Sequence, residues 1–127
     1  MSELRILLVE DSAADAELAK VRLRGVGEVE HCISLAAALA RLADTSRPRP
    51  SVVLLDLSLP DAHGLVALDR LERADPPPVL VMSGDDDPAS ERAALERGAR
   101  GFVRKGALSA DELLRTVREA ARAGDRP

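Results

Sequence analysis

The sequence predicts an α/β fold in which helices cover both faces of a five-stranded parallel sheet. Five short runs rich in Val, Ile and Leu alternate along the chain with longer segments of helical periodicity. Three of these runs, LRILLVE, VVLLD and VLVMS, are almost continuously apolar, as expected for strands that are buried on both faces. The 127 residues contain no linker or low-complexity tract, so the five units fit one domain built by right-handed crossovers.

The first half of the chain contains two complete strand–helix units and the start of a third. A strand from about Leu4 precedes a helix over about 14–24, whose apolar face is less regular. The run VEHCI, from Val29, is polar enough for an edge strand, and the next helix covers 34–44 with Ser34 as N-cap. A third strand, from Ser51 to Leu55, leads into Asp56, whose carboxylate has no oppositely charged neighbour in the sequence.

The second half repeats the alternation. A helix over 63–73 stops before the prolines at 76–78, and strands begin near Val79 and Gly101. The helix over 88–97 is mostly alanine and charge. The helix over 110–123 has one apolar and one arginine-rich arc and ends at Gly124.

Composition excludes several classes of protein. A net charge of −4 and a single aromatic residue, Phe102, disfavour nucleic-acid binding by this chain. No stretch approaches the roughly 20 apolar residues of a membrane span, and the first residues lack the features of a signal peptide. The lone Cys32 cannot form an internal disulfide, and the His and Cys residues lack zinc-ligand spacing. We therefore expect a cytoplasmic protein.

Chemically active residues follow four of the predicted strands. Glu10 and Asp11 follow the first strand, Asp56 the third, Ser83 ends the fourth and Lys105 the fifth. The carboxyl ends of parallel strands share one edge, where ligands bind in open α/β sheets. We therefore expect these five side chains to converge.

The expected cluster has a definite chemistry. Two carboxylates about 4 Å apart repel by roughly 4 kcal/mol at an effective dielectric near 20, so three require a cation, a proton or separation. An open site with oxygen ligands suits Mg²⁺. Asp56 could then act as a nucleophile toward phosphorus, with Lys105 and Ser83 contacting the phosphoryl oxygens.

The ordered motifs LLVED, VVLLDLSLPDAHG, VLVMSG and GFVRKG resemble the receiver domain of two-component response regulators, and the resemblance extends from Leu4 to Ala123. It implies a single domain over 1–127, with a core of about 4–123. The implied fold is flavodoxin-like, (βα)5, with strand order 2-1-3-4-5.

The resemblance also implies residue roles. Asp56 matches the phosphoacceptor, which takes a phosphoryl group from a histidine kinase or a histidine phosphotransfer domain. Asp11 matches the direct Mg²⁺ ligand, Glu10 the acid that usually acts through water, and Ser58 the residue whose backbone carbonyl binds the metal.

The remaining matches concern switching. Ser83 matches the hydroxyl that moves toward the phosphoryl group, and Lys105 the lysine that pairs with it. Phe102 matches the aromatic switch residue, which couples the site to the surface of the fourth helix, fifth strand and fifth helix, where dimers can also form. Gly106 departs from the usual proline, so a trans peptide or a remodelled loop is expected after Lys105.

Two other functions are alternatives to a phosphorylatable receiver. An aspartate-nucleophile phosphatase of the haloacid-dehalogenase kind needs a second Asp where this chain has Ser58. A degenerate receiver that only binds proteins is disfavoured by the complete set of site residues. The favoured interpretation is a regulatory domain. Its only expected catalysis is its own phosphorylation from a phosphodonor and its own slow dephosphorylation. The sequence is compatible with a receiver that stands alone and with one that belongs to a longer regulator or hybrid kinase.

Overall fold

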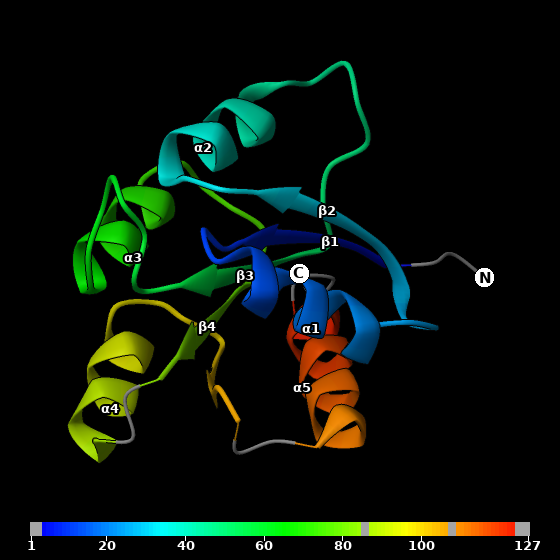
Figure 1. Ribbon diagram of the computed structural model, residues 1–127. Coiled ribbons are helices and arrows are strands. Elements are labelled where there is room, and N and C mark those ends of the chain that lie inside the picture. The colour runs from blue at the N-terminus through cyan, green and yellow to red at the C-terminus, as the bar shows by residue number, and fades with distance from the viewer. Residues whose placement is uncertain (1–3, 85–86, 107–108, 124–127) are drawn as a thin grey trace.

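The computed structural model describes residues 4–84, 87–106 and 109–123 and contains strands and helices in strict alternation (Figure 1). Their order is β1 (Leu4–Val9), α1 (Ala13–Arg22), β2 (Gly27–Cys32), α2 (Leu35–Ala43), β3 (Val52–Asp56), α3 (Leu65–Glu72), β4 (Val79–Ser83), α4 (Pro88–Glu96), β5 (Gly101–Arg104) and α5 (Ala110–Ala123). Among the described residues, no helix is long and apolar enough to cross a membrane.

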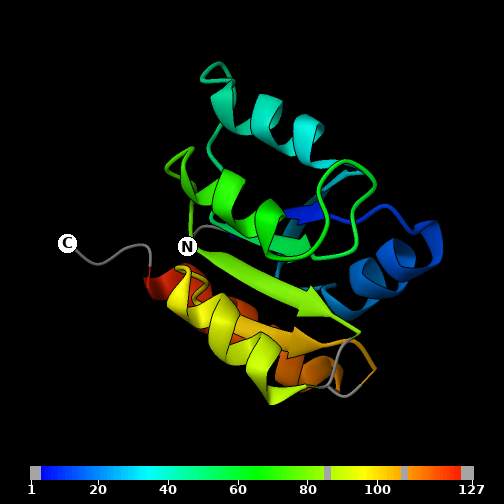
Figure 2. The ribbon, with the colours of Figure 1, turned by 90° about the vertical axis from the view of Figure 1, so that its left-hand side faces the viewer.

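The sheet confirms the predicted topology. Its five strands are ordered β2-β1-β3-β4-β5, and every neighbouring pair is parallel. The strand arrows therefore run in one direction, which Figure 2 shows from the side. The polar strand β2 lies at an edge, as its sequence predicts, and β3 and β4 are buried along their whole length.

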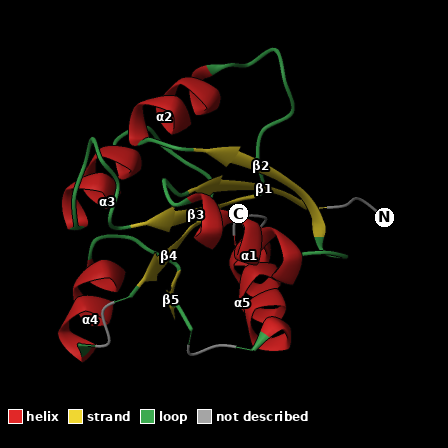
Figure 3. Cartoon of the chain, in the orientation of Figure 1, coloured by secondary structure: helices red, strands yellow, loops and turns green. Residues whose placement is uncertain are grey.

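The core has two layers, one on each face of the sheet. Helices α1 and α5 cover one face and α2, α3 and α4 the other (Figure 3). Alternate residues of one strand enter different layers: Ile6 and Leu8 pack in the α1/α5 layer, and Leu7 and Val9 in the opposite layer. Continuous apolar strands are thus the expected consequence of covering both faces.

Several element boundaries differ from the predicted ones by one to three residues. Strand β2 starts at Gly27 rather than Val29, because it pairs with β1 from Leu4 onward. Helix α3 starts at Leu65 rather than His63, because Gly64 at its N-cap has a φ of +65°, outside the helical region. These shifts do not move the strand ends that carry the site.

Side-chain caps fix the starts of three helices near the carboxyl ends of the strands. Ser12 and Ser34 cap α1 and α2, and Asp87 caps α4 by accepting from the Ala89 N–H. Asp61, in the loop after β3, also accepts from the first two N–H groups of α2, at 2.9 Å each. The neighbouring Asp85 and Asp86, and Gly124 at the predicted end of α5, lie outside the described residues.

Candidate functional site

The site lies at the carboxyl edge of the sheet, where β1 and β3 end side by side. Asp56 is the last residue of β3, and Glu10 and Asp11 directly follow β1. The Glu10 N–H donates to the Cys32 carbonyl of β2 at 2.9 Å, which continues the ladder to the end of that strand. On the other side β1 pairs with β3, with Val9 opposite Leu55, so backbone pairing brings together carboxylates that are far apart in sequence.

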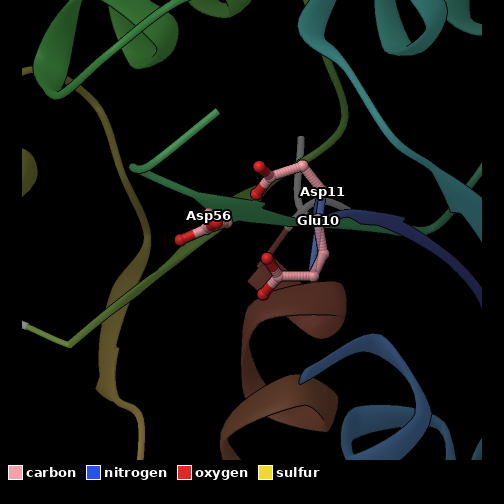
Figure 4. A group of neighbouring side chains, drawn as sticks. All are labelled: Glu10, Asp11 and Asp56. Atoms are coloured by element: carbon pink, nitrogen blue, oxygen red, sulfur yellow. The ribbon is translucent and has the colours of Figure 1, made fainter. Parts of the chain in front are cut away.

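The three predicted carboxylates form one cluster. Oxygen atoms of Glu10, Asp11 and Asp56 all lie within 4.8 Å of one another (Figure 4). Glu10 and Asp56 are each only 1% exposed, whereas Asp11 is exposed. The cluster thus has a buried floor and one side open to solvent.

The Lys105 ammonium reaches across the sheet edge to this cluster. Its Nζ lies 2.7 Å from a Glu10 oxygen and 3.3 Å from an Asp56 oxygen. Its third partner is Asp15, in the first turn of α1, at 2.9 Å. One cation is thereby shared by three carboxylates.

Burial and crowding perturb the ionisation of the cluster. Burial, followed by the neighbouring Asp56, raises the pKa of Glu10 to about 7, although Lys105 acts in the opposite direction. For Lys105, burial lowers the pKa, but the bonds to Glu10 and Asp15 outweigh it, so the pKa is raised. At neutral pH the lysine is therefore charged, and it faces three carboxyl groups.

Ser83 and Phe102 occupy the β4 and β5 side of the site. Ser83 is buried at the end of β4, and its carbonyl accepts from the Lys105 N–H at 2.8 Å. Phe102 is half-buried and packs against the α2/α3/α4 layer. The Arg104 guanidinium lies 5.5 Å from the Phe102 ring centroid and pairs with Glu91 of α4 at 3.2 Å. The aromatic ring is therefore connected to α4 through an arginine.

The loops after β3 and β5 shape the rest of the edge. Ser58 is exposed and pairs with His63 in an isolated antiparallel bridge, and the Gly64 N–H donates to the Leu57 carbonyl at 2.7 Å. The described residues contain no cis peptide bond, so the predicted trans bond before Gly106 is confirmed. Gly106 itself has a φ of +82°, a conformation that glycine adopts readily.

Two residues near the site were not singled out by the sequence. Asp15 resembles any acidic residue in the first turn of a helix, a placement that the helix dipole favours without any function. His31 carried no pattern either, yet its Nε2 lies 2.6 Å from the Glu10 carbonyl oxygen and supports the backbone at the end of β1. Their contacts depend on the strand order rather than on any local signal.

The donor set fits a hard divalent cation. All three clustered groups are carboxylates, and two of them are buried, where uncompensated negative charge is costly. The raised pKa of Glu10 expresses that cost. Oxygen ligands on a half-open edge suit Mg²⁺, which retains several waters in its coordination shell.

Sequence comparisons identify related proteins. The family model described as the response regulator receiver domain matches residues 6–118. A protein-glutamate methylesterase/protein-glutamine glutaminase from Anaeromyxobacter dehalogenans is 38% identical over 130 residues, which cover 94% of this chain and 36% of the relative. A similarly named protein from Burkholderia thailandensis is 35% identical, with the same coverage of both chains. The chain spans about a third of the length of these relatives.

Solved structures with similar folds include other response regulators. NtrX from Brucella abortus is 28% identical, with a TM-score of 0.82 over 97% of this chain and 28% of that chain. A CheY-like response regulator receiver domain protein from Methanospirillum hungatei has a TM-score of 0.81 over 98% of both chains. Its 24% identity supports the fold alone.

Proposed function

The chain belongs to the response regulator receiver domain family, and we propose that it is a Mg²⁺-dependent phosphorylation switch whose phosphoacceptor is Asp56. The observation that carries this proposal is the buried Asp56 carboxylate, which lies beside Glu10 and Asp11 and within 3.3 Å of the Lys105 ammonium. A buried acid that only capped a strand would not gather two more acids and a lysine around it.

The reaction follows from the position of Asp56. An oxygen of the Asp56 carboxylate attacks the phosphorus of a phosphohistidine, an O–P bond forms, the N–P bond breaks, and the imidazole leaves with the bonding electrons. Dephosphorylation reverses the charge change at Asp56: water attacks phosphorus, the acyl O–P bond breaks, and inorganic phosphate leaves. The product is again a free carboxylate, so the phosphorylated state is temporary.

Glu10, Asp11 and Asp56 would hold the cation, with the backbone carbonyl of Ser58 as a further ligand. When bound, Mg²⁺ neutralises charge on the transferring phosphoryl group. The exposure of Asp11 supports a direct contact with a hydrated ion, whereas Glu10 is buried and already bonded to Lys105. Lys105 and the Ser83 hydroxyl would bind the phosphoryl oxygens that remain.

The output of the switch is proposed to be a change at the α4-β5-α5 surface. Phe102 lies on β5, and its contact with Arg104 links it to Glu91 of α4, which supports this proposal. If Ser83 moves toward a phosphoryl group, the space beside β5 changes and the Phe102 ring can change rotamer. This population shift would alter the surface offered to a partner or to a second copy.

The proposed partners follow from the family. The phosphodonor is a histidine kinase or a histidine phosphotransfer domain, and the site of action is the cytoplasm. Two curated relatives are named as methylesterases and glutaminases, and this chain matches about a third of each. A methylesterase output region is therefore the first candidate for what this domain regulates, whereas the domain itself is proposed to be a regulator rather than an enzyme.

The proposal is tested by phosphorylating the chain with acetyl phosphate in the presence of Mg²⁺. Intact-mass measurement should show the addition of one phosphoryl group to the wild type. Asp56→Asn should remain unmodified, and chelation of Mg²⁺ should prevent the modification. Asp111→Asn, which changes an exposed acid in the first turn of α5, is the matched control and should be modified like the wild type.

Two results would contradict the proposal. If the wild type and Asp56→Asn gave the same unmodified mass, with beryllofluoride also failing to bind, Asp56 would not be a phosphoacceptor. Repeated turnover of many phosphate esters would instead support the phosphatase alternative. The position of Ser58, where that class needs a second acid, argues against such turnover.

A further inference from the structure

Asp15 is the contact of Lys105 that the proposed phosphorylation chemistry does not use. Its Oδ2 lies 2.9 Å from Lys105 Nζ, close to the 2.7 Å of the bond to Glu10. The side chains of Lys105 and Asp15 are 27% and 47% exposed, so this pair lies at the rim of the site while Glu10 forms its floor.

The position of the Lys105 ammonium conflicts with cation binding. The ammonium contacts Glu10 and Asp56, two of the three carboxylates that would hold a divalent ion. A lysine ammonium and a divalent cation on the same two carboxyl groups repel each other strongly at such distances. Lys105 therefore has to give up part of this contact when the cation binds.

Asp15 offers the ammonium another position. It is not part of the three-carboxylate group, so its oxygen stays available when that group binds a cation. Its backbone is fixed at the start of α1, because the Asp15 N–H donates to the Ser12 hydroxyl at 3.2 Å and the Ser12 N–H donates to Glu10 at 3.2 Å. Asp15 is thus held at a set distance from the floor of the site.

We propose that Asp15 is a positioning residue that retains the Lys105 ammonium at the rim of the site while Glu10 and Asp56 bind a divalent cation. Because the lysine stays close, it can return to a phosphoryl oxygen once Asp56 is modified. This inference rests on the proposed function, since it assigns Lys105 two successive partners in the same switching cycle.

The test is the affinity for Mg²⁺, measured by calorimetric titration of the full chain. Asp15→Asn should bind Mg²⁺ about two- to five-fold more weakly than the wild type, the range expected for a partly exposed ion pair. Asp15→Glu should restore most of the affinity. Glu17→Gln is the matched control: it removes an acid from the same helix, 72% exposed and paired with Lys20, and should change the affinity less than about 1.5-fold.

A double-mutant cycle shows whether Asp15 acts through the lysine. In a Lys105→Met background, Asp15→Asn should change the Mg²⁺ affinity no more than Glu17→Gln does. An equal loss in both backgrounds would mean that Asp15 acts on the cation by charge alone, and would overturn the inference. Unchanged affinity in Asp15→Asn, with a normal circular dichroism spectrum, would also overturn it.

The two proposals fail in different ways. If Asp15→Asn behaves like the wild type while the wild type still binds Mg²⁺ and is phosphorylated, only the role of Asp15 is lost. If the wild type neither binds Mg²⁺ nor accepts a phosphoryl group from acetyl phosphate, the proposed function and the role of Asp15 are lost together.

Discussion

Two charged clusters on the same sheet are built in opposite ways. Beside β2, three arginines contact two glutamates. We call this group the β2 charge cluster; it consists of Arg5, Glu28, Glu30, Arg41 and Arg47. At the carboxyl edge, Glu10, Asp15 and Asp56 contact one lysine, and Asp11 lies beside them. In the first cluster every glutamate has an arginine partner, whereas in the second four carboxyl groups surround a single ammonium.

The two clusters differ in how their buried charges are compensated. Arg41 is buried, and its guanidinium donates to Glu30 at 2.6 Å and to the Pro48 carbonyl at 2.7 Å. Glu10 is also buried, but its burial, followed by the neighbouring Asp56, raises its pKa. Removing one charge should therefore destabilise the first cluster and stabilise the second.

The largest effect is expected for Arg41→Ala. The substitution removes both hydrogen bonds of a buried guanidinium and leaves the Pro48 carbonyl and part of Glu30 without a partner. We expect the free energy of unfolding to fall by about 3 kcal/mol, the lower end of the cost of breaking a buried ion pair, because Glu30 keeps its contact with Arg47.

Urea unfolding followed by circular dichroism measures this loss. Arg47→Ala is its control: the Arg47 side chain is 52% exposed, so its loss should cost under about 1 kcal/mol. Equal losses in the two variants would show that burial does not distinguish the two arginines, and the contrast drawn between the clusters would lose its basis.

The second prediction concerns Glu10→Gln in metal-free protein. The pKa of Glu10 rises from 4.5 in the unfolded chain to about 7 in the fold, so folding binds an additional proton and becomes less favourable as pH rises through this range. At pH 8 the neutral Gln should stabilise the protein by roughly 1–2 kcal/mol, since one pKa unit corresponds to about 1.4 kcal/mol and part of the shift is shared with Asp56.

The pH dependence is the control within this experiment. With a chelator present, the advantage of Glu10→Gln should be lost near pH 5, where the native Glu10 is already protonated. Thermal unfolding at pH 5 and pH 8 measures both limits. A variant less stable than the wild type at pH 8 would mean that the bond to Lys105 outweighs the cost of the buried charge.

The sequence predicted which residues meet at the carboxyl edge, but not the ion pairs of the β2 charge cluster. The placement of Glu10, Asp56, Ser83 and Lys105 at one edge was predicted because each follows or ends an apolar strand, and parallel strands bring such positions together. The partners of Glu30 were not predicted, because the contact with Arg41 depends on how α2 packs beside β2.

Contacts between residues far apart in the sequence also explain why two residues near the site were not predicted. Asp15 meets a lysine that is 90 residues distant, and His31 meets a carbonyl on the neighbouring strand. The start of α3 was also missed, since it depends on the positive φ of Gly64 and not on the apolar periodicity. Hydrophobic patterns determined the topology, whereas long side chains and backbone torsions determined these details.

The smallest effect is expected for the exposed pair of the β2 charge cluster. Arg5 and Glu28 are register neighbours on β1 and β2 with a contact of 2.8 Å, but their side chains are 48% and 66% exposed. A double-mutant cycle with alanine at both positions should give a coupling free energy of about 0.5 kcal/mol or less, which falls further at high salt. The same cycle on Arg41 and Glu30 should give a larger value, because the Arg41 side chain is only 7% exposed, although Glu30 is 35% exposed. If the two coupling free energies were equal, burial would not determine how much an ion pair contributes to the stability of the β2 charge cluster. Burial would then also not explain why removing a charge is expected to stabilise the carboxyl edge and to destabilise the β2 charge cluster.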